Sequence, residues 1–176
     1  MKWIFGYGSL IWRPGIPFVQ KRKAIGRGWS RRFWQLSPDH RGTVARPGRV
    51  VTLVPDKLCD CVGMAFGIGD KNWDEVITNL DDREKNGYER HLVKLSFEDS
   101  VQGAALTYVA GPGNPSYSPF VSADGAVAQQ VLEAVGPSGT NLDYLIRLNQ
   151  SLVDMDTHDP EVSSLLDAVL KLQAVT

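Results

Sequence analysis

The chain has 176 residues, a formal net charge of −1 and 43% hydrophobic residues, which is an ordinary globular composition. This length lets one core bury about 70% of the unfolded surface, so we expect a single domain over residues 1–176 without disulfides or a structural metal. The charge gives no basic field for nucleic acid or an anionic membrane, and no apolar run reaches the roughly 18 residues of a membrane span. Met1-Lys2 lacks the apolar region of a signal peptide. We therefore expect a cytoplasmic protein whose partner is a small molecule or a protein that the sequence does not name.

The first predicted element is a short buried strand over residues 3–5, which Gly6, Tyr7, Gly8 and Ser9 interrupt at once. Glycines can adopt positive φ and leave room for a ligand to approach the backbone. Successive N–H groups in such a turn form a nest for an anion or a developing oxyanion, and Tyr7 and Ser9 add hydroxyls. A lone G-x-G pattern is also typical of a plain tight turn, and these residues alone leave both interpretations open.

Residues 29–36 alternate in part between apolar and polar side chains and predict a half-buried strand with its arginines in solvent on one face. The basic run at 21–23 and the aromatic neighbours of Arg31 and Arg32 also match a surface for single-stranded nucleic acid. We favour the strand, because the net charge supplies no wider basic field.

Four further β-branched or aromatic runs, bounded by Pro, Gly or Asp, predict strands at residues 50–54, 61–68, 91–97 and 104–109. Small side chains inside these runs favour close approach and bending of the strands. The sequence therefore predicts a strongly curved mixed sheet or small barrel of about six strands.

No metal site is expected. Cys59 and Cys61 lie on one predicted strand, facing the same side and badly placed for a disulfide. His40, His91 and His158 are scattered without a spacing that would bring two ligands together. We expect the protein to work without a metal or any other cofactor.

A helix is predicted over residues 72–84, where apolar residues recur at i, i+3, i+4 and i+7: Trp73, Val76, Ile77 and Leu80. Asn72 and Glu75 form a candidate capping box, and Gly87 is a natural end signal. The next member of the apolar stripe is Glu84. Because burying an unpaired carboxylate is costly, Glu84 is kept for chemistry, paired with a distant Arg, or exposed on a frayed end.

The rest of the chain is predicted to form a loop followed by helices. Residues 111–119 form a rigid loop in which Tyr117 stands alone among turn formers. Apolar faces predict three helices, with Thr140 and Asp143 as a capping box for the second and Asp159 as the N-cap of the third. The fold class is therefore α+β, with a curved mixed sheet or small barrel surrounded by helices.

Six blocks in one order resemble the ChaC-type gamma-glutamylcyclotransferases. They are FGYGSLIW at 5–12, RRFWQ at 31–35, DHRGT at 39–43, PGRVVTLV at 47–54, REKNGY at 83–88 and GPSGTN at 136–141. The resemblance runs from about residue 3 to about residue 150. Asn86 and Leu36 depart from it, since the family usually has Gly at the first position and commonly at the second.

The resemblance implies a gamma-glutamylcyclotransferase fold and a site. The glycine loop would bind the γ-glutamyl group through Gly6, Tyr7, Gly8, Ser9, Leu10 and Ile11. Glu84 would be the catalytic base, and Tyr117, in an N-P-x-Y block, would hold the α-amino or α-carboxylate group. The implied reaction cleaves glutathione to 5-oxoproline and cysteinylglycine by attack of the substrate's own α-amine. Two alternatives stay open, namely a cyclotransferase for other γ-glutamyl amino acids or amines, and a non-catalytic cation-transport regulator.

Overall fold

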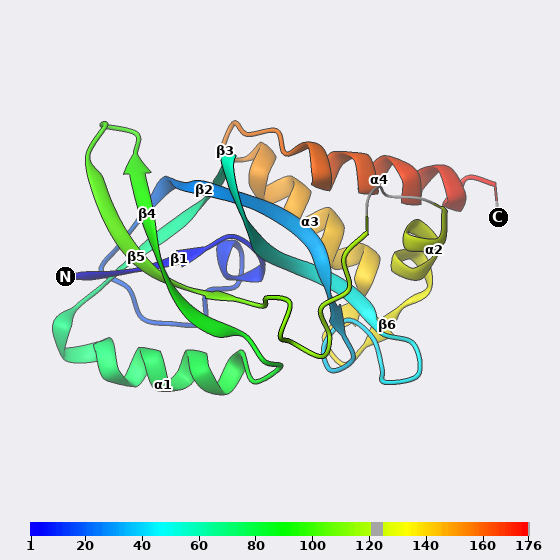
Figure 1. Ribbon diagram of the computed structural model, residues 1–176, viewed down its shortest axis with the longest axis horizontal. Helices are drawn as coiled ribbons and strands as arrows, with labels where there is room; N and C mark the ends of the chain where they lie inside the picture. The colour runs from blue at the N-terminus through cyan, green and yellow to red at the C-terminus, as the bar shows by residue number, and fades with distance from the viewer. Residues whose placement is uncertain (121–124, 176) are drawn as a thin grey trace. The chain divides into compact units, whose positions relative to one another are not determined.

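The computed structural model describes residues 1–120 and 125–175 (Figure 1). These residues divide into two compact units. The first unit holds Met1–Arg31 and Leu53–Pro115. The second holds Arg32–Thr52 and the chain from Ser116 on. Two long strands contribute residues to both units.

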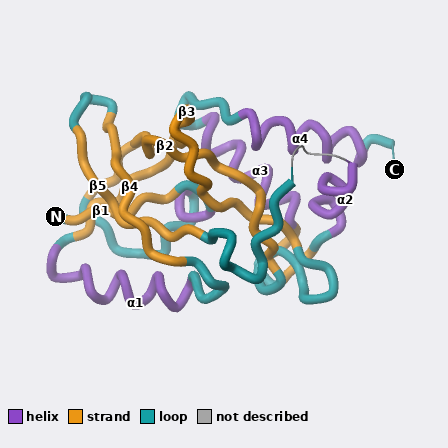
Figure 2. Tube along the Cα trace, viewed as in Figure 1, coloured by secondary structure: helices purple, strands orange, loops and turns teal. Residues whose placement is uncertain are grey.

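A closed barrel of five strands occupies residues 2–109, in the order β1-β3-β2-β4-β5 (Figure 2). Its strands are β1 (Lys2–Gly6), β2 (Gln20–Ser37), β3 (Gly48–Ile68), β4 (Glu89–Phe97) and β5 (Gln102–Val109). Ile4 of β1 lies opposite Phe66 of antiparallel β3 and opposite Leu106 of parallel β5. Strand β1 therefore closes the barrel between a neighbour on each side.

Small residues allow this curvature, as the sequence predicts. The ring of Phe5 is fully buried and packs over positions that carry no side chain. A Cβ at Gly63 would lie 2.4 Å from the carbonyl oxygen of Gly6 and 2.8 Å from the Phe5 ring, and one at Gly26 would lie 3.1 Å from the same ring. Larger residues at these positions would push the strands apart.

Two predicted strand boundaries are wrong. The runs at 50–54 and 61–68 belong to one strand, β3, and the strand predicted at 29–36 begins already at Gln20. The middle of β3 is polar and exposed, which gives it the composition of a turn. Two carboxylates in this part of β3 nevertheless contact β2. Asp56 accepts a hydrogen bond from the hydroxyl of Ser30 over 2.9 Å, and Asp60 pairs with Arg27.

Helix α1 (Trp73–Arg83) follows a 3₁₀ turn, η2 (Asp70–Asn72), and buries the predicted stripe. Val76, Ile77 and Leu80 pack in a cluster with barrel residues that include Ile4 and Phe66. The predicted capping box is wrong, because Asn72 already has helical dihedral angles and its side chain makes no cap hydrogen bond.

The second unit carries α2 (Gly125–Glu133), α3 (Asn141–Val153) and α4 (Pro160–Gln173), which pack on one another, and a small sheet of β6 (Val135–Gly136) and β7 (Gly139–Thr140). The predicted N-caps of α3 and α4 are confirmed. Thr140 accepts a hydrogen bond from the backbone of Asp143, and Asp159 accepts from the first turn of α4. Asp143 does not complete the capping box, since its carboxylate binds two arginines instead.

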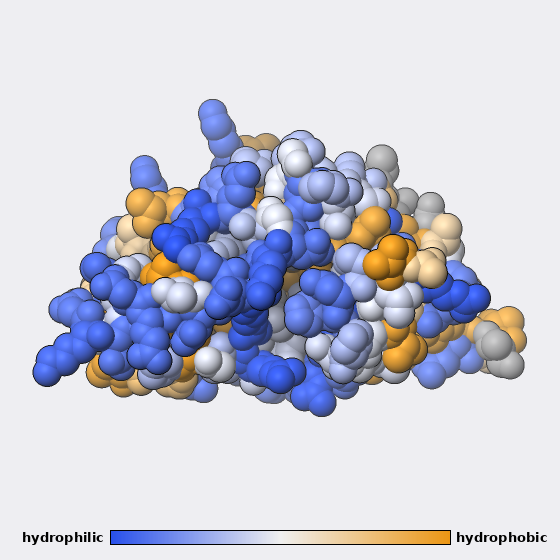
Figure 3. Space-filling view, turned by 90° about the horizontal axis from the view of Figure 1, so that it is seen from below, coloured by the Kyte–Doolittle hydropathy of each residue, from blue (hydrophilic) through white to orange (hydrophobic). Residues whose placement is uncertain are grey.

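The surface is mixed. Hydrophilic residues predominate on the face in Figure 3, and hydrophobic residues form small separate patches there. Single exposed apolar residues are normal for a folded protein. In the described part of the chain, no helix is long and apolar enough to cross a membrane.

Candidate active site

The glycine loop (residues 6–11) turns sharply at the end of β1. Ser9–Ile11 form a 3₁₀ turn, η1, in which the N–H of Ile11 donates to the carbonyl of Gly8 over 3.0 Å. The expected positive φ is wrong for Gly8, whose φ is −128°. At Gly6 the reason for glycine is space, because a Cβ there would lie 2.7 Å from the Cβ of Leu10.

Side chains of the loop anchor it to the barrel. Tyr7 is buried, and its hydroxyl donates to the carbonyl of Tyr108 on β5 over 2.6 Å. Leu10 packs in the apolar cluster beneath α1. Ser9 and Ile11 are half-buried. The structure thus uses the hydroxyl of Tyr7, which we expected to face a ligand, to hold the loop on the barrel wall.

Arg31 also holds the loop, and the predicted environment of its side chain is wrong. Its side chain is only 3% exposed, although we predicted strand arginines in solvent. The Nε donates to the carbonyl of Tyr7 over 2.8 Å, and Nη2 donates to the carbonyl of Val62. A strand arginine can point inward when backbone carbonyls accept hydrogen bonds from its guanidinium. The apolar and polar alternation of the strand does not reveal acceptors that are distant in the sequence.

Glu84 stands at the end of α1. The last helical residue is Arg83, and the backbone N–H of Glu84 closes the final turn onto the carbonyl of Leu80 over 2.9 Å. Gly87, with φ of +73°, belongs to the turn that follows. The Glu84 side chain is 21% exposed, so it lies at the edge of the packed region rather than in its centre.

Arg83 lies beside the Glu84 carboxylate, with 3.5 Å between Nε and Oε1. On a continuous helix these neighbouring side chains would point in different directions. They meet because Glu84 leaves the helix with φ −96° and ψ +29°. The carboxylate thereby has a partner cation at the place where the apolar stripe ends.

The same guanidinium holds the glycine loop. Nη2 of Arg83 donates to the hydroxyl of Ser9 over 3.0 Å. Nη1 donates to the carbonyls of Arg13 and Pro14 over 3.0 Å and 2.9 Å. Two segments more than 70 residues apart in sequence, the loop and the end of α1, therefore converge on one side chain.

A second acidic residue near the end of α1, Asp81, binds side chains of the barrel strands. Asp81 accepts a hydrogen bond from the hydroxyl of Tyr108 over 2.7 Å and pairs with Arg90. Hydrogen bonds from Arg90 and Tyr108 lower the pKa of Asp81. Burial, and then the bond to Asp81, raise the pKa of Tyr108, so its hydroxyl stays a donor. Asp81 is thus held ionised by partners of its own.

Tyr117 lies in the second unit. It forms an isolated antiparallel bridge with Gln35, and its ring meets the ring of Trp34 edge-on at 6.0 Å between centroids. Burial raises the pKa of the Tyr117 hydroxyl, which is therefore a neutral donor at physiological pH. Arg49 fixes the same segment through hydrogen bonds to Ser118.

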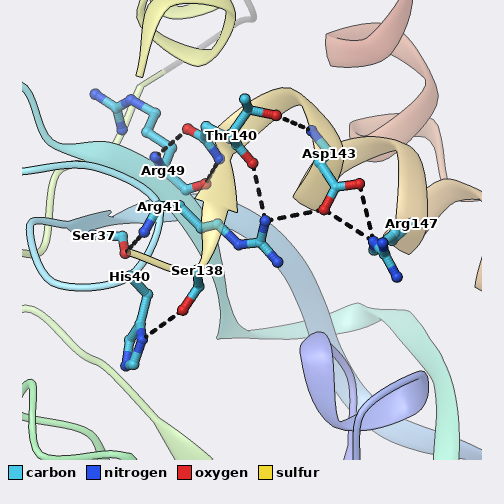
Figure 4. A network of polar contacts seen from close by, with 9 residues as sticks. Ser37, His40, Arg41, Arg49, Ser138, Thr140, Asp143 and Arg147 are labelled. Atoms are coloured by element: carbon cyan, nitrogen blue, oxygen red, sulfur yellow. Dashed lines mark hydrogen bonds and ion pairs between the residues drawn. The ribbon is translucent and has the colours of Figure 1, made fainter. Parts of the chain in front are cut away.

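Three of the sequence blocks meet in a polar network of the second unit (Figure 4). Arg41 donates to the carbonyl of Thr140 over 3.0 Å and pairs with Asp143 at 3.1 Å. His40 and Ser138 lie 3.2 Å apart through Nδ1 and Oγ. The Arg41 contacts join the turn after β2 to the start of α3, and the His40 contact joins it to the turn between β6 and β7, so the network fixes the loops of this unit.

No group of three or more His, Cys, Asp or Glu side chains that could hold a metal is found among residues 1–120 and 125–175. Cys59 and Cys61 are free thiols, the first exposed and the second buried. The residues that converge around Arg83 are therefore a carboxylate, a hydroxyl and backbone groups, which suit proton transfer and hydrogen bonding.

The chain is similar to known proteins over most of its length. A family model described as ChaC-like protein matches residues 2–172. Glutathione-specific gamma-glutamylcyclotransferase 1 of Homo sapiens is 39% identical over 173 residues, which cover 95% of this chain and 78% of the human protein. The glutathione-specific gamma-glutamylcyclotransferase of Escherichia coli is 32% identical over 174 residues, covering 98% and 74%.

The fold is similar to that of a solved enzyme. The crystal structure of a gamma-glutamyl cyclotransferase specific to glutathione from yeast aligns with a TM-score of 0.91 at 28% identity, and the alignment covers 97% of this chain and 96% of the yeast chain.

Proposed function

The chain belongs to the ChaC-like protein family, and from this premise we propose that it is a gamma-glutamylcyclotransferase that cleaves glutathione to 5-oxoproline and cysteinylglycine. Curated relatives at 38–39% identity carry the name glutathione-specific gamma-glutamylcyclotransferase 1. The observation that carries the proposal is the convergence of Glu84 and the glycine loop on Arg83.

The reaction needs no nucleophile from the protein. The α-amine of the γ-glutamyl group attacks the γ-carbonyl carbon, and a C–N bond closes a five-membered lactam. The amide bond to cysteine breaks, and its nitrogen leaves as the amine of cysteinylglycine. The attacking amine loses a proton and the leaving amine gains one, so no water is consumed. The protein must fold the flexible γ-glutamyl chain, handle the proton and stabilise the oxyanion.

We assign the proton to Glu84. Its carboxylate accepts a proton from the attacking amine and returns it to the leaving amine, which lets one group serve both halves of the reaction. Its half-buried position just after α1 supports this role, because the side chain is partly exposed while the backbone N–H of Glu84 ties the residue to the last turn of the helix. Asp81 is the weaker candidate, since hydrogen bonds from Arg90 and Tyr108 lower its pKa and so make it a poorer proton acceptor.

We assign binding of the γ-glutamyl group to the glycine loop. The half-buried backbone at Gly8 and the adjoining turn offer polar groups close to Glu84's partner Arg83. Tyr117 stays a prediction from the N-P-x-Y block, and its hydroxyl, whose pKa burial raises further, is suited to donate to a carboxylate.

We further propose that residues 1–176 act as one domain, because β2 and β3 each contribute residues to both units. The proposed compartment is the cytoplasm and the proposed partner is the small substrate alone, without nucleic acid or membrane.

The test is product analysis with purified protein. Glutathione should yield 5-oxoproline and cysteinylglycine in equal amounts, measured by mass spectrometry. A parallel panel of γ-glutamylcysteine, γ-glutamylalanine and a γ-glutamylamine separates strict glutathione specificity from a broader cyclotransferase. Release of free glutamate instead of 5-oxoproline would indicate hydrolysis, and no turnover of any substrate would favour a non-catalytic regulator.

A further inference from the structure

Arg83 has contacts that neither substrate binding nor proton transfer explains. Its side chain is 28% exposed, and both Nη atoms donate to oxygens of the chain itself. The acceptors are the hydroxyl of Ser9 and the carbonyls of Arg13 and Pro14, while Nε faces the carboxylate of Glu84. A guanidinium is suited to this task, because its donors fan out in a rigid plane toward several acceptors at once.

The segment after the glycine loop is shaped around this guanidinium. Gly15 has φ of +60°, a conformation that favours glycine, and a Cβ there would lie 3.6 Å from Nη1 of Arg83. One residue later Ile16 is buried in the same apolar cluster as Val76 and Leu80 of α1. Residues 13–16 are therefore held on α1 by a polar contact at one end and an apolar contact at the other.

We infer that Arg83 is the positioning residue of the site. It sets the glycine loop, through Ser9 and residues 13–14, at a fixed place relative to the Glu84 carboxylate that it also contacts. This inference rests in part on the proposed function, since its effect on turnover requires Glu84 to be the base. The effect on the loop itself requires only the contacts described.

A positioning role predicts a particular kinetic pattern. Misplacement of reacting groups by about 1 Å costs on the order of 10²-fold in rate. Arg83→Met should therefore lower kcat/KM for glutathione by about 10²-fold, through both a higher KM and a lower kcat. A merely structural role would reduce the amount of folded enzyme, which lowers apparent kcat and leaves KM unchanged.

Arg83→Lys separates charge from shape. Lysine keeps a cation near Glu84, but its single ammonium cannot reach three acceptors that lie in different directions. We expect this milder variant to fold, as judged by circular dichroism, and still to lose about 10-fold or more in kcat/KM. Full activity of Arg83→Lys would overturn the inference. The control is Lys85→Met, which removes a neighbouring cation that is 74% exposed and should stay within about twofold of wild type.

A double variant tests the route through Ser9. If Arg83 acts through the Ser9 hydroxyl, Arg83→Met with Ser9→Ala should be no more impaired than Arg83→Met alone. Losses of kcat/KM that multiply in the double variant would show that the two residues act independently, and would overturn this route.

Hydrogen exchange decides the matter without any substrate. In Arg83→Lys the amides of residues 9–13, 15 and 16 should exchange faster than in wild type, while those of β4 and β5 should be unchanged. If wild type turns over no γ-glutamyl compound but this segment loosens, the proposed function fails and the positioning role stands. If wild type is active and the segment exchanges at the wild-type rate in Arg83→Lys, only the positioning inference fails.

Discussion

The side chain of Asn141 pairs with the backbone of Arg49 as a neighbouring strand would. Its Oδ1 accepts from the N–H of Arg49 over 2.6 Å, and its Nδ2 donates to the carbonyl of the same residue over 2.7 Å. Asn141 is fully buried, so water cannot replace either bond. The neighbouring Gly48 leaves room for it, since a Cβ there would lie 2.9 Å from Oδ1 of Asn141.

We predict that Asn141→Leu destabilises the protein by about 2–5 kcal/mol, because it leaves a buried N–H and a buried carbonyl without partners. Urea unfolding followed by circular dichroism measures the change. Gln150→Leu on the exposed side of the same helix is the control and should change the free energy of unfolding by less than about 0.5 kcal/mol. If Asn141→Leu is as stable as wild type, water must replace the lost hydrogen bonds to the backbone N–H and carbonyl of Arg49.

Glu84→Gln should fold normally and lose turnover. The amide keeps the size and polarity of the side chain but cannot accept the proton, which costs about 10²–10⁴-fold in kcat. The measurement is the rate of 5-oxoproline formation at saturating glutathione. Near wild-type turnover in the purified variant would place the base elsewhere.

Gly6→Ala should damage the glycine loop for steric reasons. The added Cβ would lie 2.7 Å from the Cβ of Leu10, so either the loop or the strand end must shift. We expect a loss of about 1–3 kcal/mol in stability together with a raised KM. Thermal unfolding and steady-state kinetics test the two effects, and a variant unchanged in both would show that the loop adjusts freely.

Ser9→Ala should be mild by comparison. It removes one hydrogen bond, worth about 0.5–1.5 kcal/mol, while Arg83 keeps its bonds to two backbone carbonyls. The expected loss in kcat/KM is about 2- to 10-fold. A trapped γ-glutamyl ester on Ser9, or a loss as large as that of Glu84→Gln, would contradict intramolecular cyclisation and indicate covalent catalysis.

Treatment with a chelator should leave activity intact. The attacking amine belongs to the substrate, and the proposed roles of Glu84 and the glycine loop use no metal. Activity is measured after dialysis against EDTA, with untreated protein as the control. Activity that disappears and returns on addition of zinc or magnesium would refute this mechanism.

Local sequence patterns predicted the helices well where the buried residues follow the helical repeat and where a capping residue marks the start of a helix. The stripe from Val76 to Leu80 is buried as expected, and Thr140 and Asp159 cap their helices. The exposed middle of β3 misled the prediction, because polar residues there resemble a turn. Composition alone cannot show that Asp56 bonds to Ser30 on the strand alongside.

The sequence pointed to residues of the candidate site but not to the contacts that they make. A carboxylate at the end of an apolar stripe drew attention to Glu84 without reference to any relative. Arg83 was missed as its neighbour, because helical geometry was assumed to continue where the backbone turns away. Arg31 was missed as a buried anchor, since its acceptors at Tyr7 and Val62 are distant in sequence.

The parallel pairing of β1 with β5 has a consequence for the order of folding. Ile4 pairs with Leu106, and the hydroxyls of Tyr7 and Thr107 bond across the same seam to the carbonyls of Tyr108 and Phe5. Bringing together segments about 100 residues apart costs chain entropy that local contacts cannot offset early, so such contacts form slowly. The glycine loop is therefore ordered only when the barrel closes, and a partly folded chain has no assembled site.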